Sequence, residues 1–295
     1  RVTTGLGATS VSLSGDGRRL AYAAYAARAN IWSVPIPSSG SVSAESATPV
    51  TTGNQVIESM RVSSDGRWLL YDSNLQGNSD IFRLPIRGGP SEQLTSDPVD
   101  EFAPDLSPDG RTLVYHTWRT GTRDIEVKPL DGAPTLLVTD TPMQESYPAW
   151  SPDGRSLLFS DQTPPVNSIH VTRRGADGRW APAAKLVDSA QSPQWSPDGA
   201  SVAFVAGGST EETHAIRTMP AAGGPTRSVF VLDADSPGAE AVRWSPDSRQ
   251  LYFKAHDAAG RTSLWGLSAT GGTPRMLVRF PNLERQSTRF DFAVD

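Results

Sequence analysis

The sequence predicts an all-β fold, a β-propeller of four-stranded antiparallel blades. Three observations lead to this prediction. A Ser-Pro-Asp-Gly-Arg motif or a close variant, followed by a short apolar run, recurs every 44 to 49 residues along the 295-residue chain. Each repeat has room for four short strands, and no segment keeps a period of 3.6 residues. A fixed period of this length is typical of propellers and other repeat folds. The copies begin at Ser14, Ser63, Ser107, Ser151, Ser196 and Ser245.

The motif itself predicts a tight β-hairpin. In the fourth copy, residues 147–151 form an extended segment, residues 152–155 a turn and residues 157–159 the returning strand. Proline fixes φ at the second turn position, aspartate can bond its own backbone, and glycine accepts a positive φ. Turn chemistry therefore explains the recurring aspartate, and no catalytic role is needed. A β-sandwich also contains many short strands, but it does not require one turn chemistry at one spacing.

Two further strands complete each repeat. A third strand follows a loop with Gly, Asn or Asp, and a fourth follows a second, Gly-rich turn. Three tryptophans just before the motif serine share one register, so we expect them to pack between blades. The third strands are expected at 30–32, 80–82, 124–126, 168–170, 215–217 and 263–265. Fourth strands are expected at 49–51, 93–95, 136–138 and 275–278, and the tryptophans are Trp150, Trp195 and Trp244.

The two ends of the chain indicate a seventh, incomplete repeat. Residues 1–5 resemble residues 49–53 and read as a fourth strand, while residues 287–295 align with a first strand and turn. The sequence therefore predicts one propeller domain over residues 1–295, with six complete repeats and a split partial seventh. Rings commonly close by completing the last blade from both termini, which removes open edges. Two interpretations stay open, a seven-bladed parent and a six-bladed ring with an appended tail.

Composition excludes several classes of function. The chain has no cysteine, so disulfides and thiolate metal sites are excluded. It carries 27 basic and 32 acidic residues, a net charge of -5, which argues against nucleic-acid binding. No apolar run approaches the roughly 20 residues of a membrane helix, so we expect no membrane insertion by this segment. We expect a monomer.

The repeats resemble the WD-like repeats of TolB-type propellers. The resemblance rests on the hairpins of the type WSPDGRSLLF and on the following strands at 77–82 and 121–125, and it covers nearly the whole chain. The stretches ANIWSVPIP and PVTTGNQ are similar to propeller segments of bacterial sensor proteins that carry a kinase or winged-helix domain. This resemblance implies a periplasmic or extracytoplasmic protein-binding scaffold. Similar propellers also gate prolyl-oligopeptidase-like peptidases, and some are lyases that hold a metal near the propeller axis.

Motifs for catalysis and metal binding are sparse. The nucleophile motif G-x-S-x-G is absent. Acidic residues at 97–101 and 233–235 do not match the calcium-loop pattern. The histidines share no ligand spacing, so we predict no catalytic residue, metal or cofactor. A propeller can still gather equivalent positions of different blades at its axis, which keeps a metal site open as an alternative. The four histidines are His116, His170, His214 and His256.

One constellation near the predicted channel is a candidate ligand-binding site. Acidic or amide residues precede the first strand of successive repeats, where the chain would reach one mouth of the central channel. A second set stands two residues before the motif serine, on the predicted channel wall. One interpretation of both sets is structural: ion pairs between blades and a rim of solvated side chains. The alternative is functional: an acidic channel mouth that attracts a cationic group of a ligand. The mouth set is Glu58, Glu101, Glu145, Gln191 and Glu240. The wall set is Arg61, Asp105, Gln194, Arg243 and Asp291.

The sequence therefore predicts a non-enzymatic propeller scaffold. It would bind a protein, a peptide or a small ligand at one face or at the channel mouth, as the sensory part of a bacterial envelope protein. The alternatives are a metal-assisted lyase or hydrolase, and the substrate-gating propeller of a peptidase. Rings of this kind carry their function in variable loops on rigid walls.

Overall fold

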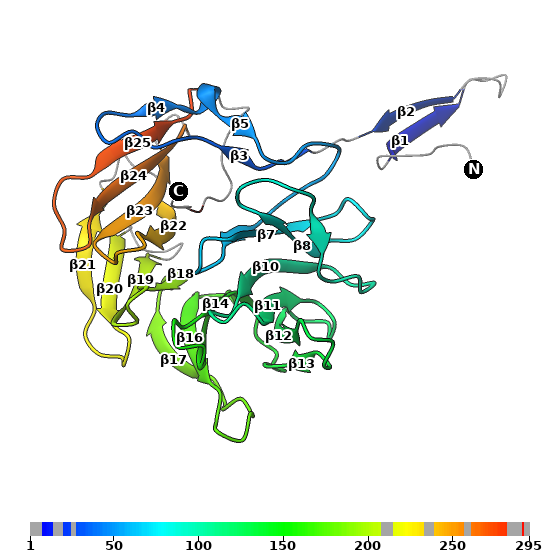
Figure 1. Ribbon diagram of the computed structural model, residues 1–295. Helices are drawn as coiled ribbons and strands as arrows, with labels where there is room; N and C mark the ends of the chain where they lie inside the picture. The colour runs from blue at the N-terminus through cyan, green and yellow to red at the C-terminus, as the bar shows by residue number, and fades with distance from the viewer. Residues whose placement is uncertain are drawn as a thin grey trace.

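Five sheets, each built on four antiparallel strands, are arranged around a common centre in the computed structural model, and the last of them carries an added parallel strand (Figure 1). The structure describes residues 8–13, 20–24, 28–207, 215–232, 239–256, 261–281 and 291. We number the five sheets as blades I to V in chain order. The predicted propeller of four-stranded blades is confirmed, with five such blades in the described part of the chain.

Each blade runs from an innermost strand to an outermost strand. Blade I consists of β6 (Met60–Val62), β7 (Trp68–Ser73), β8 (Asp80–Pro85) and β9 (Glu92–Gln93). Blade II consists of β10 (Glu101–Leu106), β11 (Thr112–Thr117), β12 (Asp124–Pro129) and β13 (Leu136–Leu137). Blade III consists of β14 (Glu145–Trp150), β15 (Ser156–Asp161), β16 (Ser168–Arg173) and β17 (Ala184–Asp188). Blade IV consists of β18 (Ala190–Trp195), β19 (Ser201–Ala206), β20 (Ala215–Pro220) and β21 (Arg227–Val231). Blade V consists of β22 (Ala239–Trp244), β23 (Gln250–His256), β24 (Thr262–Ser268) and β25 (Arg275–Arg279).

The first repeat departs from the prediction of six complete repeats. Its hairpin, β1 (Ala8–Leu13) with β2 (Leu20–Ala24), forms a separate two-stranded sheet that stands away from the blades (Figure 1). Its outer strands, β3 (Trp32–Ser33) and β5 (Thr48–Pro49), form another two-stranded sheet, here called the closing sheet. Residues 1–7 and most of 287–295 lie outside the described residues, so the predicted seventh repeat is represented by Asp291 alone.

Two sequence features account for the divided first repeat. The returning strand β2 reads LAYAA, whereas its counterpart in blade I begins WLLY, so β2 offers less apolar area for burial between blades. The segment between β3 and β5 also contains Pro35 and Pro37, which lack the backbone N–H that a sheet needs. That segment instead forms β4 (Val42–Ser43), which pairs in parallel with β25, and a single 3₁₀ turn at Ala44–Ser46.

The closing sheet lies between blades V and I. Ile31 packs with Leu69, Tyr71 and Phe82 of blade I. The segment around β4 packs instead on blade V, where Ala44 joins the buried core of that blade. The closing sheet therefore connects the last blade to the first, and the N-terminal part of the chain is part of the ring closure.

The hairpin turns repeat one hydrogen-bond pattern. In blade III, Ser151 Oγ donates to Asp153 Oδ1 over 2.5 Å, and the Arg155 backbone N–H donates to the same oxygen over 3.0 Å. Ser151 Oγ in turn accepts from the backbone N–H of Ser156. Gly154 has a φ of 68°, as the turn requires. The same serine–aspartate bond occurs in blades I, II, IV and V, so the structural interpretation of the recurring aspartate is supported.

The cores lie between neighbouring blades. Trp150 packs with Leu157 and Phe159 of its own blade and with blade II residues. Trp195 and Trp244 occupy the corresponding cores between blades III and IV and between blades IV and V. The three tryptophans therefore pack between blades, as expected from their shared register.

Replacing a turn aspartate should destabilise one hairpin without changing the fold. We expect Asp153→Ala to lower the free energy of unfolding by about 1 kcal/mol, because two turn hydrogen bonds to a carboxylate are lost. Chemical denaturation of the purified protein measures this change. Asp140→Ala, at an exposed aspartate without a turn bond, is the control. Equal midpoints for Asp153→Ala and the parent would contradict the structural role of the motif.

Candidate ligand-binding site at the central channel

The innermost strands enclose a small central cavity. Its volume is about 40 Å³, enough for a few water molecules and well below the size of ordinary ligand pockets. The backbone at Ala103, Tyr147 and Ser192 has a positive φ of 53° to 55°, and the ladders of β10, β14 and β18 shift register there. These bulges shape the wall of the cavity. The lining residues are Ser59, Met60, Arg61, Ala103, Pro104, Tyr147, Pro148, Ser192, Gln194 and Arg243.

Four charged wall residues form one connected network, here called the charge belt. Arg61 Nε lies 3.4 Å from Asp105 Oδ1 and 4.0 Å from Asp291 Oδ2. Arg243 Nε lies 3.5 Å from Asp291 Oδ1. All four side chains are largely buried, with exposed fractions of 8% to 17%. The charge belt thus contains two cations and two anions. The ion pairs between blades that the sequence predicts among the wall residues are present as Arg61–Asp105 and Arg243–Asp291.

Both aspartates of the charge belt also bind a backbone N–H group of another blade. Asp105 Oδ2 accepts from the N–H of Trp150 in blade III, and Asp291 Oδ2 accepts from the N–H of Val62 in blade I, each over 2.9 Å. Asp105 thus contacts an arginine of the preceding blade and a backbone N–H of the following blade. Asp291 does the same with Arg243 of blade V and Val62 of blade I. The fifth wall residue, Gln194, is buried and lines the cavity without a charged partner.

The mouth residues do not form the open acidic rim that the sequence suggested. Glu58 is exposed and Gln191 is half-buried, but Glu101 and Glu145 are fully buried. The side chain of Glu240 lies outside the described residues. The burial has a simple cause, since Glu101 and Glu145 are the first residues of β10 and β14 and pair with β11 and β15. Their side chains are consequently covered by neighbouring structure.

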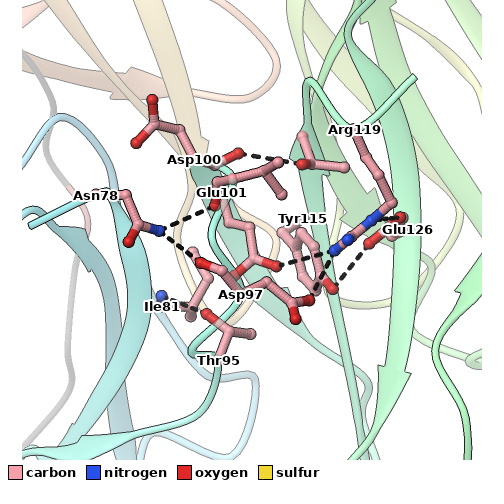
Figure 2. A network of polar contacts seen from close by, with 11 residues as sticks. Asn78, Ile81, Thr95, Asp97, Asp100, Glu101, Tyr115, Arg119 and Glu126 are labelled. Carbon is pink, nitrogen blue, oxygen red and sulfur yellow. Dashed lines mark hydrogen bonds and ion pairs between the residues drawn. The ribbon is translucent and has the colours of Figure 1, made fainter. Parts of the chain in front are cut away.

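Glu101 lies in a polar network between blades I and II (Figure 2). Arg119 joins three carboxylates there. Its Nη2 lies 2.7 Å from Asp97 Oδ2 and 3.9 Å from Glu101 Oε1, and its Nε lies 2.8 Å from Glu126 Oε1. Tyr115 donates a hydrogen bond to the other oxygen of Glu126 over 3.0 Å. One guanidinium therefore contacts two buried carboxylates and the partly exposed Asp97. The repeat register did not indicate Arg119, Glu126 or Tyr115.

Burial is the main cause of the raised pKa values of the carboxyl groups at the blade interfaces. It raises the pKa of Glu101 to about 7, and repulsion from Asp97 acts in the same direction. Burial also raises the pKa of Glu145 to about 7, although Thr141 Oγ1 donates a hydrogen bond to it over 2.5 Å. Asp72 has a pKa raised by burial to about 7, and it accepts backbone hydrogen bonds from both blades I and II. Of the three, Asp72 links blades I and II through its backbone hydrogen bonds.

An aromatic cluster extends from the cavity wall to the surface. His116 lies 5.8 Å from Phe102, 5.5 Å from Trp118 and 5.7 Å from Tyr147, measured between ring centroids. Tyr147 lines the cavity, whereas the Trp118 side chain is 41% exposed. Arg123 covers the Trp118 ring at 5.5 Å. The sequence analysis did not find this cluster, because its members come from three different strands and the loop after β11.

The histidines have no common site. His116 belongs to the aromatic cluster, His170 contacts Ser168 and Phe159, and His256 contacts Thr262. His214 lies outside the described residues. Within the described ranges, no three His, Asp or Glu residues lie close enough to hold a metal ion.

Five four-stranded blades around a narrow central cavity define this protein as a β-propeller. The family model of the TolB β-propeller domain matches residues 9–182, more than half of the chain, so the chain belongs to this family. No curated protein gives a significant match to the sequence. No helix in the described part of the chain is long and apolar enough to cross a membrane.

Solved structures share the fold at low sequence identity. A protein from Agrobacterium tumefaciens assigned as TolB is 21% identical, with a TM-score of 0.64 over 78% of this chain and 83% of that chain. TolB from Acinetobacter baumannii is 18% identical, with a TM-score of 0.63 over 80% of this chain and 60% of that chain. An oligogalacturonate lyase from Vibrio parahaemolyticus is 12% identical, with a TM-score of 0.58 over 85% and 74% of the two chains. At these identities the likeness extends to the fold alone.

The buried glutamates predict an unusual dependence of stability on pH. Because the folded state raises the pKa of Glu101 and Glu145 to about 7, it binds protons more tightly than the unfolded chain. The free energy of unfolding should therefore fall as pH rises from about 4.5 to 7, and stay low above that. Glu101→Gln and Glu145→Gln should each raise stability at pH 8 by about 1–3 kcal/mol relative to the parent.

Denaturation at pH 5 and at pH 8 tests this expectation. The gain in each Gln variant should be larger at pH 8, because the parent carries the buried charge only there. Exposed Glu45→Gln is the matched control and should leave the profile unchanged. A gain that is equal at both pH values would show that these carboxyl groups do not titrate in this range.

The charge belt predicts that Asp291 contributes to ring closure. We expect Asp291→Asn to lower the free energy of unfolding by about 1–3 kcal/mol, because the amide keeps an acceptor for Val62 but loses two ionic contacts. Asp105→Asn should have a smaller effect, because Asp105 has one ionic contact and its burial, which raises the pKa of the carboxyl group, offsets part of that contact. Thermal denaturation measures both. A parent-like melting temperature for Asp291→Asn would contradict this role.

Proposed function

We propose that this propeller is a non-enzymatic scaffold that binds a protein or peptide partner on one face of the ring. That face, here called the mouth face, contains the loops between the second and third strands of each blade. Hydrogen bonds between Val56 and Asn74, and between Gln144 and Gln162, join these loops to the segments that precede the innermost strands. The mouth face therefore includes Glu58 and surrounds one end of the central cavity.

Exposed apolar side chains on the mouth face carry this proposal. Leu75, Trp118 and Val166 lie in the equivalent loops of blades I, II and III, with exposed fractions of 52%, 41% and 41%. Trp118 is also supported from below by the aromatic cluster, which limits its mobility. Rigid aromatic side chains surrounded by smaller apolar groups are typical centres of protein interfaces.

The cavity and the charge belt favour surface binding over uptake of a small molecule. A volume of about 40 Å³ does not admit a ligand of ordinary size. The two arginines and two aspartates of the charge belt balance one another. The charge belt therefore has no net charge that would attract a charged ligand. Exposed Glu58 adds negative charge to the mouth face, which suits a partner segment that combines an apolar side chain with a basic one.

The resemblance of the repeats to TolB-type propellers also supports a periplasmic or other extracytoplasmic location. A protein-binding role for related propellers agrees with the proposal, since rigid rings with variable loops are suited to recognition. The assignment of the mouth face, however, rests on Trp118 and its neighbours.

Peptide selection tests the proposal directly. A displayed random peptide library is selected on the immobilised protein, and the dissociation constants of the selected peptides are then measured in solution. We expect Trp118→Ala to weaken their binding at least tenfold, because removal of an anchoring tryptophan costs about 2 kcal/mol or more. Trp32→Ala is the matched control, an exposed tryptophan on the closing sheet.

The result that would overturn the proposal is equally specific. If the selected peptides bind Trp118→Ala and the parent with equal affinity, or if Trp32→Ala weakens them to the same degree, the mouth face is not the binding surface. Both variants should remain folded at the temperature of the binding assay, so that a loss of binding reflects the surface and not the fold.

A further inference from the structure

A second cavity lies on blade V, at the ends of the strands opposite the mouth face. Its volume is about 390 Å³, within the range of small-molecule pockets and almost ten times that of the central cavity. It lies beside the hairpin turn between β22 and β23 and the turn between β24 and β25. The side chains that matter for its chemistry are Arg249, Gln250, Ser268, Thr273 and Arg275, above a floor at Gly266.

Comparison with blade I explains why this cavity exists. In blade I, Arg83 on the third strand pairs with Glu92 on the fourth, and their side chains form an ion pair of 2.8 Å. The equivalent pair in blade V is Gly266 with Arg275. The side chain that Arg83 contributes in blade I is absent at Gly266, where the Tyr252 ring and Leu277 occupy the space closest to the sheet. Arginine in place of the glutamate reverses the charge beside that space.

Glycine is tightly constrained at this floor position. A Cβ atom on Gly266 would lie 3.1 Å from the Tyr252 ring and 3.2 Å from Leu277. Tyr252 stands where blade I has Leu70, so a larger ring fills the layer beneath the missing side chain. The floor is therefore a packed surface and the cavity opens outward from it.

Arg275 is held in place without being neutralised. Its Nη1 donates hydrogen bonds to the backbone oxygens of Pro37 and Gly40 over 3.2 Å and 2.8 Å. These acceptors are uncharged, and Nε and Nη2 remain available. Among the described residues, no carboxylate lies within 4.0 Å of the Arg275 guanidinium.

Arg249 supplies a second positive charge. Its backbone N–H is used in the hairpin turn, where it donates to Asp247 Oδ1 over 3.0 Å. The hydrogen bond from Ser245 and the positive charge of Arg249 lower the pKa of the nearby Asp247, so this acid offsets part of the Arg249 charge. Among the described residues, Asp247 makes no ion pair within 4.0 Å with Arg249 or Arg275. Arg227 of blade IV adds positive charge at the neighbouring turn, where it donates to the backbone oxygens of Ala269 and Thr270.

We propose that the blade V cavity binds an oxyanion, a phosphate or carboxylate group carried by a small molecule. Two guanidinium groups can grip such a group through paired N–H donors, which is the strongest form of neutral-pH anion recognition by side chains. The Ser268 and Thr273 hydroxyls and the Gln250 amide add uncharged donors. The volume exceeds that of a bare anion, so the rest of the ligand fits beside the glycine floor. This site is separate from the mouth face and does not depend on the proposed scaffold function.

Binding measurements with defined anions test this site. Isothermal titration of the purified 295-residue protein is carried out with inorganic phosphate, glycerol 3-phosphate and succinate, at constant ionic strength set with chloride. We expect at least one probe to bind with a millimolar or tighter dissociation constant. Stronger binding of glycerol 3-phosphate identifies a phosphate ester as the ligand class, and stronger binding of succinate identifies a carboxylate.

Variants separate the site from general surface charge. Arg249→Gln should weaken binding of the preferred probe at least tenfold, because one of two gripping groups is lost. Arg155→Gln is the matched control, since Arg155 has the same place in the hairpin turn of blade III. Arg275→Gln should act like Arg249→Gln, but it also releases the segment around Pro37, so its melting temperature is measured as well.

The proposal is overturned by any of three results: no measurable binding of all three probes, equal binding by Arg249→Gln and the parent, or the same loss in Arg155→Gln. Because Arg249 lies exposed on a turn, Arg249→Gln should keep the fold of the parent. A difference in binding between this variant and the parent therefore reports on the site.

Discussion

A ring of blades is stable only if its last blade is fastened to its first, and here the carboxylate of Asp291 makes that connection. It faces Arg243 of blade V and Arg61 of blade I and accepts the backbone N–H of Val62. Through Arg61 the same network reaches Asp105 of blade II. The closing sheet and β4 complete the junction on the outer side, where they pack on blades I and V. The cavity, the mouth face and the blade V pocket all depend on this closure, because each is formed between or upon blades that the ring holds in place.

The interior of the ring combines apolar cores with buried acids at the blade interfaces. Glu101, Glu145 and Asp72 lie between apolar layers, and burial raises the pKa of each to about 7. Replacement by apolar groups would remove a desolvation penalty, but Asp72 also binds three backbone N–H groups that would otherwise be buried without acceptors. Asp72 thus fixes the relative position of blades I and II. The aromatic cluster packs against Trp118 and so holds this side chain in place on the mouth face.

Local chemistry made much of this architecture predictable. The Ser-Pro-Asp-Gly motif specifies its own turn, so the hairpins, the strand order within a blade and the pairs Arg61–Asp105 and Arg243–Asp291 could be read from the repeat register. Features that depend on contacts between repeats could not. The register places Glu101 near the mouth, but whether it is exposed depends on Thr117 and Arg119 of its own blade and on blade I. The separation of β1 and β2 from the blades has no signal in the motif, which is present at residues 14–18 as elsewhere. Likewise, Gly266 and Arg275 become informative only when cross-strand pairing aligns them with Arg83 and Glu92.

The parallel pairing of β4 with β25 has a consequence for the order in which the molecule can be assembled. Arg275 bonds to residues 235 and 238 positions earlier in the chain, and Asp291 bonds to a residue 229 positions earlier. Contacts of such long sequence separation form late, because the loop that joins them must first be closed. During synthesis the closing sheet emerges from the ribosome long before its partners on blade V exist. The nascent chain therefore passes through an open arc of blades with an exposed sheet edge, and the emergence of β25 and Asp291 allows the arc to close into a ring.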